Sequence, residues 1–350
     1  MSKQLQAVAI AAPGFFGLNT QQSGAVTGQG FALKAENCVI DKYGRLGSRN
    51  GWSYVSTAKD TVADANVGVN LKGLTRFLDV AGVETYISWS DDKFYTGITD
   101  LTTVTPTTSD TIAAGNWQAA SLNDHHYFFQ SGYKPLLYTY HTGSVEFLDV
   151  DSHAHSSGTA PKGNTVLSAY GRLWVADLAT EKTTVYFSDV LDGAKWNTGT
   201  AGSLDISAVL TKGTDQIVAL GAHNGNLVIF CRDSIIIYED GDNFQGSFDT
   251  TSLTLVEVIQ GVGCVARDSV QNLGDDILFL SANGVRSLSR VIQEKSQPLS
   301  DVSRNVQDDI VQLLQGETST SVKSVYSASN SFYLISFLNA GSTYCFDTRR

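Results

Sequence analysis

The chain has 350 residues, of which 42% are hydrophobic and 17% charged, and its formal net charge is −11. This composition excludes a disordered chain, and the acidic charge disfavours tight binding to nucleic acid, because phosphate contacts need Lys and Arg. With 32 Gly, 5 Pro and many aromatic and β-branched residues, the composition favours strands joined by tight turns over helices.

The first 30 residues form a separate segment, which we predict to be an N-terminal arm (residues 1–30) of loop-like structure. Phe15 and Phe16 stand between glycines within it, and such an aromatic pair needs a surface to pack on. The pair either fills the chain's own core or docks on a neighbouring subunit. We take Phe15 and Phe16 as candidate subunit-interface residues.

Apolar runs recur along the rest of the chain at intervals of roughly 40 to 55 residues, the period of a four-stranded propeller blade. The runs are Tyr86–Trp89, Tyr127–Phe129, Arg172–Val175, Leu227–Phe230, Ile277–Leu280 and Phe332–Ile335. A second strand follows each run, and the turn at Asn283-Gly284 is typical of a hairpin. Four runs also follow a strand of small residues, at 119–121, 165–168, 217–220 and 265–270, which suits the crowded centre of a propeller.

These repeats predict an all-β fold, a β-propeller of about five or six blades over residues 31–350. A two-sheet sandwich is the rival, since it also has short alternating strands but needs no longer period. Propellers close when strands from both chain ends share a blade. We expect the strand around Tyr344–Phe346 to pair with the region Phe31–Ile40, although the chain can also be a fragment of a longer protein.

One segment departs from the β pattern and predicts an inserted α-helix near residues 300–315. Val302, Val306 and Ile310 fall on one face at helical spacing, and Ser300 is placed to cap the helix. The helix either covers one blade or docks on a partner ring. We therefore add Val306 and Ile310 to the candidate subunit-interface residues.

Motifs of catalysis and cofactor binding are missing from the sequence. It holds no G-x-S-x-G, P-loop, HExxH or G-x-G-x-x-G pattern. A polar loop contains two acids and two histidines that could hold a metal, but a solvated loop is the simpler interpretation: Asp149, Asp151, His153 and His155. Glu239–Asn243 lacks the ordered oxygen ligands of a calcium loop and suits a hairpin tip. We predict no catalytic, cofactor-binding or metal residue and no cofactor.

The four cysteines and the apolar runs limit the chain's environment. Cys38, Cys231, Cys264 and Cys345 form no CxxC pair, so reduced thiols are expected and a zinc site has little support. No run reaches the ~20 apolar residues that span a membrane, and we predict no membrane span.

The segment Ser188–Trp196 is the strongest indication of an enzyme. It resembles the Asp-box turn of sialidase-type propellers, although Asp192 and Gly193 are adjacent where the Asp-box keeps one residue between them. The Asp-box is structural even in those enzymes, and a glycosidase also needs two acids at a working separation. A glycan-binding or glycan-cleaving β-propeller is therefore the alternative function, and a scaffold propeller with a protein ligand is a third.

The order of several short segments along the chain is more informative than any one of them. A Gly-rich arm is followed by Gly44–Trp52 and then by blade units that include Asn226–Phe230, Ser234–Tyr238 and Phe279–Ser281. Over most of residues 10–347 this order resembles the tail nozzle, or tail hub, proteins of short-tailed bacteriophages (podoviruses), the tail tubular protein B-like family. Members of that family are often longer than this chain.

The resemblance implies a structural virion protein and not an enzyme. In that family, six copies form a ring below the portal and adaptor, enclose the channel through which the genome leaves, and support tail fibres or spikes. It thus implies a homo-oligomer, most simply a hexamer, that is made in the host cytoplasm and located in the virion tail. The acidic charge agrees with DNA passing through without specific binding.

Overall fold

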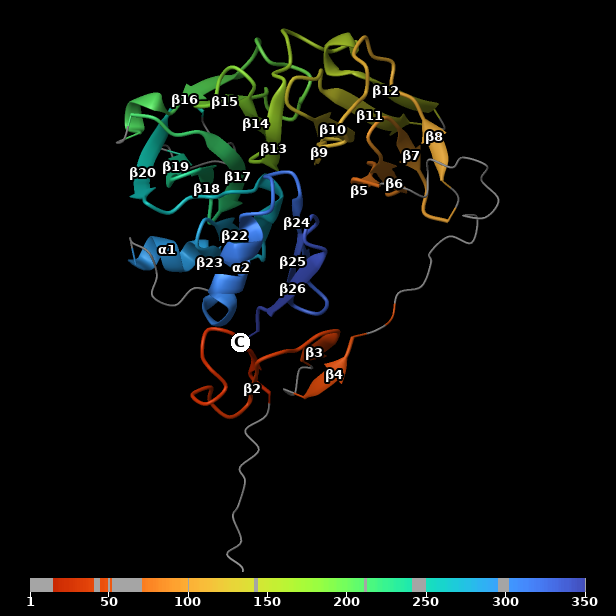
Figure 1. Ribbon diagram of the computed structural model, residues 1–350. Coiled ribbons are helices and arrows are strands. Elements are labelled where there is room, and N and C mark those ends of the chain that lie inside the picture. Colours follow the sequence, from red (N-terminus) through yellow and green to blue (C-terminus); the bar gives the residue numbers. More distant parts are fainter. Residues whose placement is uncertain are drawn as a thin grey trace, which may run out of the picture.

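The computed structural model describes residues 15–40, 45–49, 51, 71–99, 101–141, 144–210, 213–240, 250–294 and 302–349. Within these residues, six antiparallel sheets follow one another in chain order around a common centre (Figure 1). The predicted all-β propeller is confirmed, with six blades. The first blade starts at Gly73, so the described segments before residue 50 lie outside the blades.

The first four blades each have four strands, joined in chain order. Blade one comprises β5 (Gly73–Leu78), β6 (Glu84–Trp89), β7 (Phe94–Thr96) and β8 (Thr102–Val104). Blade two comprises β9 (Gln118–Leu122), β10 (His125–Phe129), β11 (Leu136–His141) and β12 (Ser144–Asp149). Blade three comprises β13 (Gly163–Ala169), β14 (Arg172–Leu178), β15 (Thr184–Phe187) and β16 (Gly202–Asp205). Blade four comprises β17 (Ile217–His223), β18 (Asn226–Cys231), β19 (Ser234–Asp240) and β20 (Leu253–Gln260).

The last two blades have three strands each in the described part of the chain. They are β21 (Gln271–Asn272), β22 (Ile277–Ser281) and β23 (Gly284–Ser287) in blade five, and β24 (Val322–Ser327), β25 (Phe332–Phe337) and β26 (Ser342–Asp347) in blade six. Helix α1 (Leu288–Glu294) lies beyond β23, where the first four blades place a fourth strand (Figure 1). The sequence did not predict α1, because the alternation from Val285 onward continues the strand pattern up to its first turn.

The predicted helix near residues 300–315 is present but begins later than its sequence suggests. A 3-10 turn, Arg304–Val306, leads into α2 (Gln307–Leu314), and Ser300 lies outside the described residues. The fully buried Ser303 does not cap α2, because its Oγ accepts a hydrogen bond from the Val285 N–H at 2.9 Å. None of the helices in the described chain is both long and apolar enough to cross a membrane.

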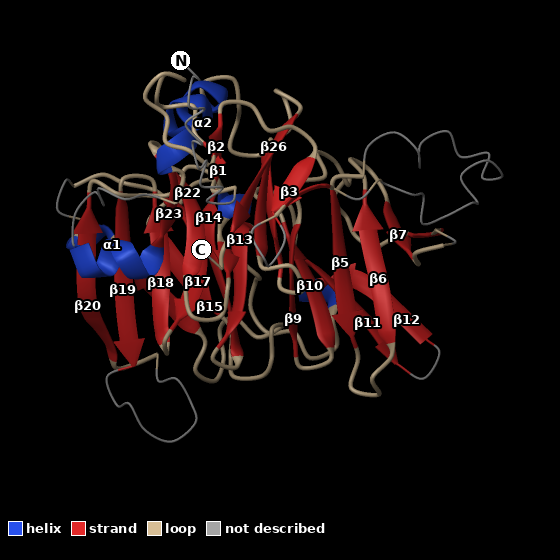
Figure 2. Cartoon of the chain, turned by 90° about the horizontal axis from the view of Figure 1, so that it is seen from below, coloured by secondary structure: helices blue, strands red, loops and turns tan. Residues whose placement is uncertain are grey.

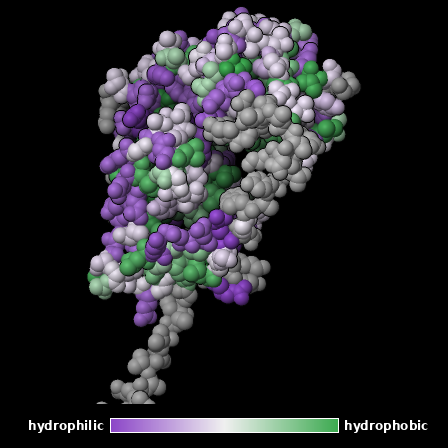
Figure 3. Space-filling view, turned by 45° about the vertical axis from the view of Figure 1, so that its right-hand side comes forward, coloured by the Kyte–Doolittle hydropathy of each residue, from purple (hydrophilic) through white to green (hydrophobic). Residues whose placement is uncertain are grey.

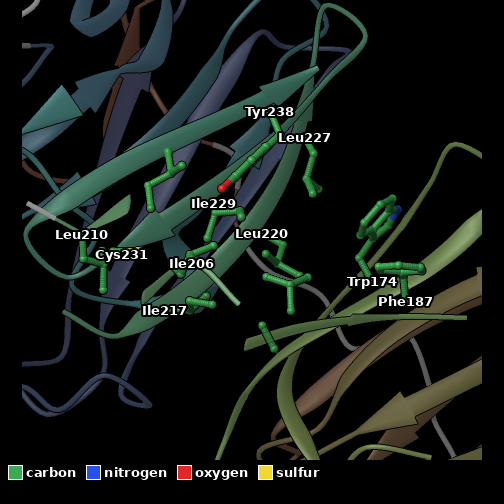
Figure 4. Close-up of a cluster of buried hydrophobic side chains, with 13 residues drawn as sticks. Trp174, Phe187, Ile206, Leu210, Ile217, Leu220, Leu227, Ile229, Cys231 and Tyr238 are labelled. Carbon is green, nitrogen blue, oxygen red and sulfur yellow. The ribbon is translucent and has the colours of Figure 1, made fainter. Parts of the chain in front are cut away.

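Apolar side chains fill the spaces between successive blades. Five buried clusters in the described chain join blades one to two, two to three, three to four, four to five and five to six. Figure 4 shows the third of these, in which Trp174 and Phe187 of blade three face Leu220 and Leu227 of blade four. Burying a side chain of this size stabilises the fold by about 1.5 to 3 kcal/mol relative to exposure. Each sheet is therefore stabilised by its neighbours.

The centre of the propeller is polar, and it is organised by Arg267, which is only 4% exposed. Its guanidinium forms a two-bonded ion pair with Asp268, at 2.6 and 3.0 Å. It also donates to the main-chain oxygens of Asn164 at 2.6 Å and Asn116 at 3.2 Å. Lys323 also pairs with Asp268, at Oδ2. The network thus joins blades two, three, five and six.

Arg267 reaches the centre because the chain turns where a fourth small-residue strand was expected. Three of those expected inner strands form as β9, β13 and β17, but residues 265–270 contain a 3-10 turn, Arg267–Ser269. The hydroxyl of Ser269 donates to the Ala266 oxygen at 2.6 Å and accepts from the Leu280 N–H at 3.0 Å. Side-chain hydrogen bonds replace the strand ladder here.

The region of β3 and the last strand, β26, do not share a blade, which corrects the predicted closure. Among the described residues, β26 pairs with β25, whereas β3 (Cys38–Ile40) pairs with β4 (Leu46–Ser48) in a sheet of its own. Contact between the ends comes from a side chain, since Arg349 Nη2 donates to the Ile40 oxygen at 3.4 Å. Strand β3 pairs with β4, its neighbour in the sequence, and not with the distant β26.

Candidate functional site

The N-terminal arm lies against helix α2, so two elements that the sequence singled out separately meet on one face of the propeller (Figure 2). In the arm, β1 (Gly17–Leu18) pairs in parallel with β2 (Phe31–Ala32). Thr20 then fixes the arm to the helix: its N–H donates to the Asn305 oxygen at 2.9 Å, and its Oγ1 donates to Asp309 Oδ2 at 2.7 Å. We call this region the arm–helix surface: residues 15–33 together with Arg304–Leu314.

Of the two predicted aromatic anchors, Phe16 is the more exposed. Its side chain is 49% exposed, and its ring centroid lies 5.7 Å from that of Phe31. Phe15 is half-buried, and Leu18 packs on the core of blades five and six. The arm is thus held to its own chain by Leu18 and Thr20, while Phe16 keeps half of its surface in contact with solvent.

Val306 and Ile310 are placed differently from Phe16. Val306 is 5% exposed and Ile310 is fully buried, and both pack in the cluster that joins blades five and six. Their burial agrees with a helix that covers blades of its own chain. The exposed face of α2 carries polar side chains, among them Asp308 and Gln312.

Exposed apolar residues extend the arm–helix surface toward β4. They are Phe16, Val26, Leu33 and Leu46. Figure 3 shows hydrophobic side chains gathered at the lower end of the molecule, over these N-terminal segments. Nothing in the sequence singled out Val26, Leu33 or Leu46, because single apolar residues in a polar stretch are common at protein surfaces.

The loop that could have held a metal uses its acids for structure. Asp149 Oδ2 accepts from the Ser109 N–H at 3.4 Å, and Asp151 Oδ1 accepts from the Ala160 N–H at 2.8 Å. The rings of His153 and His155 lie 5.5 Å apart. The described residues contain no group of three or more His, Cys, Asp or Glu side chains that could hold a metal ion. Of the suggested calcium loop, Gly241, Asp242 and Asn243 lie outside the described residues.

The segment that resembles an Asp-box forms a turn after β15, and its two acids, Asp189 and Asp192, bond to nearby groups of the same blade. Asp189 Oδ1 accepts from the N–H and Oγ1 of Thr200 at 3.0 and 2.9 Å. These bonds hold the pKa of Asp189 below its ordinary value. Asp192 accepts from the Ala194 N–H at 3.0 Å, and Trp196 donates from Nε1 to the Gly193 oxygen at 3.0 Å. The arrangement stabilises a hairpin.

Comparisons with known proteins concern the fold. No family model matches the chain, and no curated protein is significantly similar to it. Among solved structures, the extracellular domain of a hybrid two component system from B. thetaiotaomicron is 11% identical with a TM-score of 0.48, over 88% of this chain and 37% of that chain. The C-terminal WD40 domain of Sif2 is 9% identical with a TM-score of 0.46, over 89% and 88%. The WD40 domain of Neurospora crassa Pan2 is 10% identical with a TM-score of 0.42, over 80% and 75%.

Proposed function

We propose that this chain is a structural subunit of a ring in the tail of a short-tailed bacteriophage, where it forms part of the nozzle, or hub, through which the genome leaves. The observation that carries the proposal is the arm–helix surface. There the arm is anchored by Leu18 and Thr20, yet it presents Phe16 and Leu33 to solvent, at 49% and 52% exposure. An anchored segment with exposed apolar side chains suits contact with a neighbouring subunit.

The chemistry of the described residues gives further support. The acids of the turn after β15 are used in local hydrogen bonds, and Arg267 at the centre of the propeller donates its N–H groups to neighbouring blades. The ordered resemblance to nozzle proteins also supports the proposal. The net charge of −11 supports it as well, because negative charge along a channel wall keeps DNA from adhering. The ring is proposed to be a hexamer that contacts portal or adaptor and fibre or spike proteins.

The mass of the protein in solution, measured by light scattering over a range of concentrations, tests this proposal. We expect a ring-sized species, alone or with portal and adaptor proteins, and a shift to monomer in the double variant Phe16→Ser and Leu33→Ser. The matched control is Leu338→Ser, which removes an equally exposed leucine at 55% from blade six. A monomer under all these conditions, including with tail partners, would refute the proposal.

A further inference from the structure

A polar cavity of about 200 Å³ lies at the centre of the propeller, beside the Arg267 network. Its lining includes Asp177, Lys182, Gln216, Arg232 and Arg267, with Thr320 contributed from the segment before blade six. A cavity of this size is far larger than the space of one water molecule, about 30 Å³. It can therefore hold a small solute.

The lining carries a positive charge in a protein that is acidic as a whole. Among the described residues that line it, Lys182, Arg232 and Arg267 are cations and Asp177 is the one acid, so their formal balance is three minus one, or +2. The charged groups behind the lining are Asp268, Lys323 and Asp215, and with their two negative charges and one positive charge the balance remains positive, at +1.

The three cations differ in how many of their N–H donors remain available to a ligand. Arg267 donates all of its N–H groups to Asp268, Asn116 and Asn164, and so acts as a fixed wall. Lys182 pairs with Asp177 at 2.6 Å but keeps a side chain that is 40% exposed. It retains donors beyond that one bond.

Arg232 is the cation best placed to bind an incoming anion. Arg232 is an exposed residue that lines the cavity. The nearby carboxylate of Asp215 accepts hydrogen bonds from the main-chain N–H of Arg232 at 3.1 Å and from the hydroxyl of Ser234 at 2.7 Å. Asp215 thus fixes the turn that presents Arg232. A planar guanidinium on a fixed turn matches the two oxygens of a carboxylate or phosphate.

We propose that this cavity binds a small oxyanion, a phosphate or carboxylate group, with Arg232 and Lys182 as its charged donors and the Gln216 amide beside them. The guanidinium of Arg232 donates hydrogen bonds to the two anionic oxygens. Lys182, from the neighbouring blade, adds a single positive charge. Nothing in this proposal depends on the assembly proposed above.

Calorimetric titration of the full chain at low salt with inorganic phosphate, and separately with succinate, tests the site and distinguishes the two anions. The test variant is Arg232→Gln, and the matched control is Arg304→Gln, which makes the same charge change at an exposed arginine on the 3-10 turn before α2. Since a hydrogen bond to a charged group contributes about 1.5 to 3 kcal/mol, we expect Arg232→Gln to weaken binding about tenfold or more. Arg304→Gln should leave binding within about twofold.

The variant Arg232→Lys keeps the charge but loses the planar fork, and we expect binding between that of the parent and that of Arg232→Gln. Unchanged thermal unfolding would show that Arg232→Gln still folds, as the exposure of Arg232 leads us to expect. Equal weakening in Arg232→Gln and Arg304→Gln would mean general charge attraction and would overturn the site. The absence of saturable binding of either anion at millimolar concentration would overturn it as well.

Discussion

Arg267 Nη1 donates a 2.6 Å hydrogen bond to the main-chain oxygen of Asn164, which lies 103 positions earlier in the chain. Through this bond, blade five is fixed to blade three across the centre of the propeller, although the two blades are not neighbours. The same guanidinium bonds Asn116 at the start of blade two. The apolar clusters join each blade to the next, so the polar centre adds a second set of connections that does not follow the order of the chain.

Replacing Arg267 with leucine should destabilise the fold strongly. The change leaves Asp268 and two main-chain oxygens with fewer partners in a buried place, a situation that typically costs about 3 to 5 kcal/mol. The measurement is the free energy of unfolding in urea. Arg76→Leu serves as the control, since Arg76 is 54% exposed and its ion pair with Glu84 is 3.5 Å long; a change of at most about 1 kcal/mol is expected there. Equal losses in the two variants would contradict the role of the network.

The ionisation of Asp268 should make stability depend on pH. Burial raises the pKa of this carboxyl, but the charges of Arg267 and Lys323 outweigh burial and hold it below its ordinary value. A carboxyl with a lower pKa in the folded state stabilises the fold above the unfolded pKa and loses this contribution as pH falls through the folded pKa. We expect the free energy of unfolding to fall below about pH 5, and to fall less steeply in Asp268→Asn. Parallel pH profiles of stability for the parent and Asp268→Asn would show that the ionisation of Asp268 does not cause the loss of stability.

His126 should remain neutral in the folded protein well below its ordinary titration range. Burial between Phe77 and Phe128 lowers its pKa to about 4. The unfolded chain therefore takes up the proton first, and the contribution to stability falls as pH drops from about 6.5 toward 4. Imidazole NMR signals followed against pH should show no titration of His126 above pH ~5. A midpoint near 6.5 would show that the ring is solvated.

The two interpretations of helix α2 are separated by replacing Ile310 with alanine. Because Ile310 is fully buried in the cluster of blades five and six, the isolated chain should lose about 2 to 5 kcal/mol of stability. Leu338→Ala, at a residue that is 55% exposed, should change stability by no more than about 0.5 kcal/mol. An Ile310→Ala chain that unfolds like the parent but fails to assemble would instead support a contact with a partner.

The cysteines should react with thiol reagents according to their burial. Cys231 and Cys264 are buried, and burial raises the pKa of their thiols to about 12 and about 11. Burial also raises the pKa of the Cys345 thiol to about 11, so access to the reagent, and not the thiolate fraction, distinguishes Cys345 from Cys264. We expect mass spectrometry of the labelled native protein to find the label on Cys345, which is exposed, and on the half-buried Cys38. Label on Cys264 before unfolding would show that blade five opens.

Much of the fold was predictable because it depends on local pattern. The run Ile277–Leu280, the turn at Asn283 and Gly284, and the strand that follows form β22 and β23 as expected. The start of α2 was not predictable, because Ser303 bonds the Val285 N–H and not the first turn of the helix. For the candidate site, the sequence indicated the arm and the helix, but not that Thr20 joins them.

The sequence by itself determined the β-propeller class, since hydrophobic periodicity and turn residues act over a few positions and repeat blade after blade. Only the tertiary structure decided that Arg267 lies at the centre, that Ile310 faces the core and that Phe16 stays half-exposed. The physical reason is that burial and hydrogen bonding at these positions come from blades and segments that are distant in the chain, and a local pattern does not contain those distances.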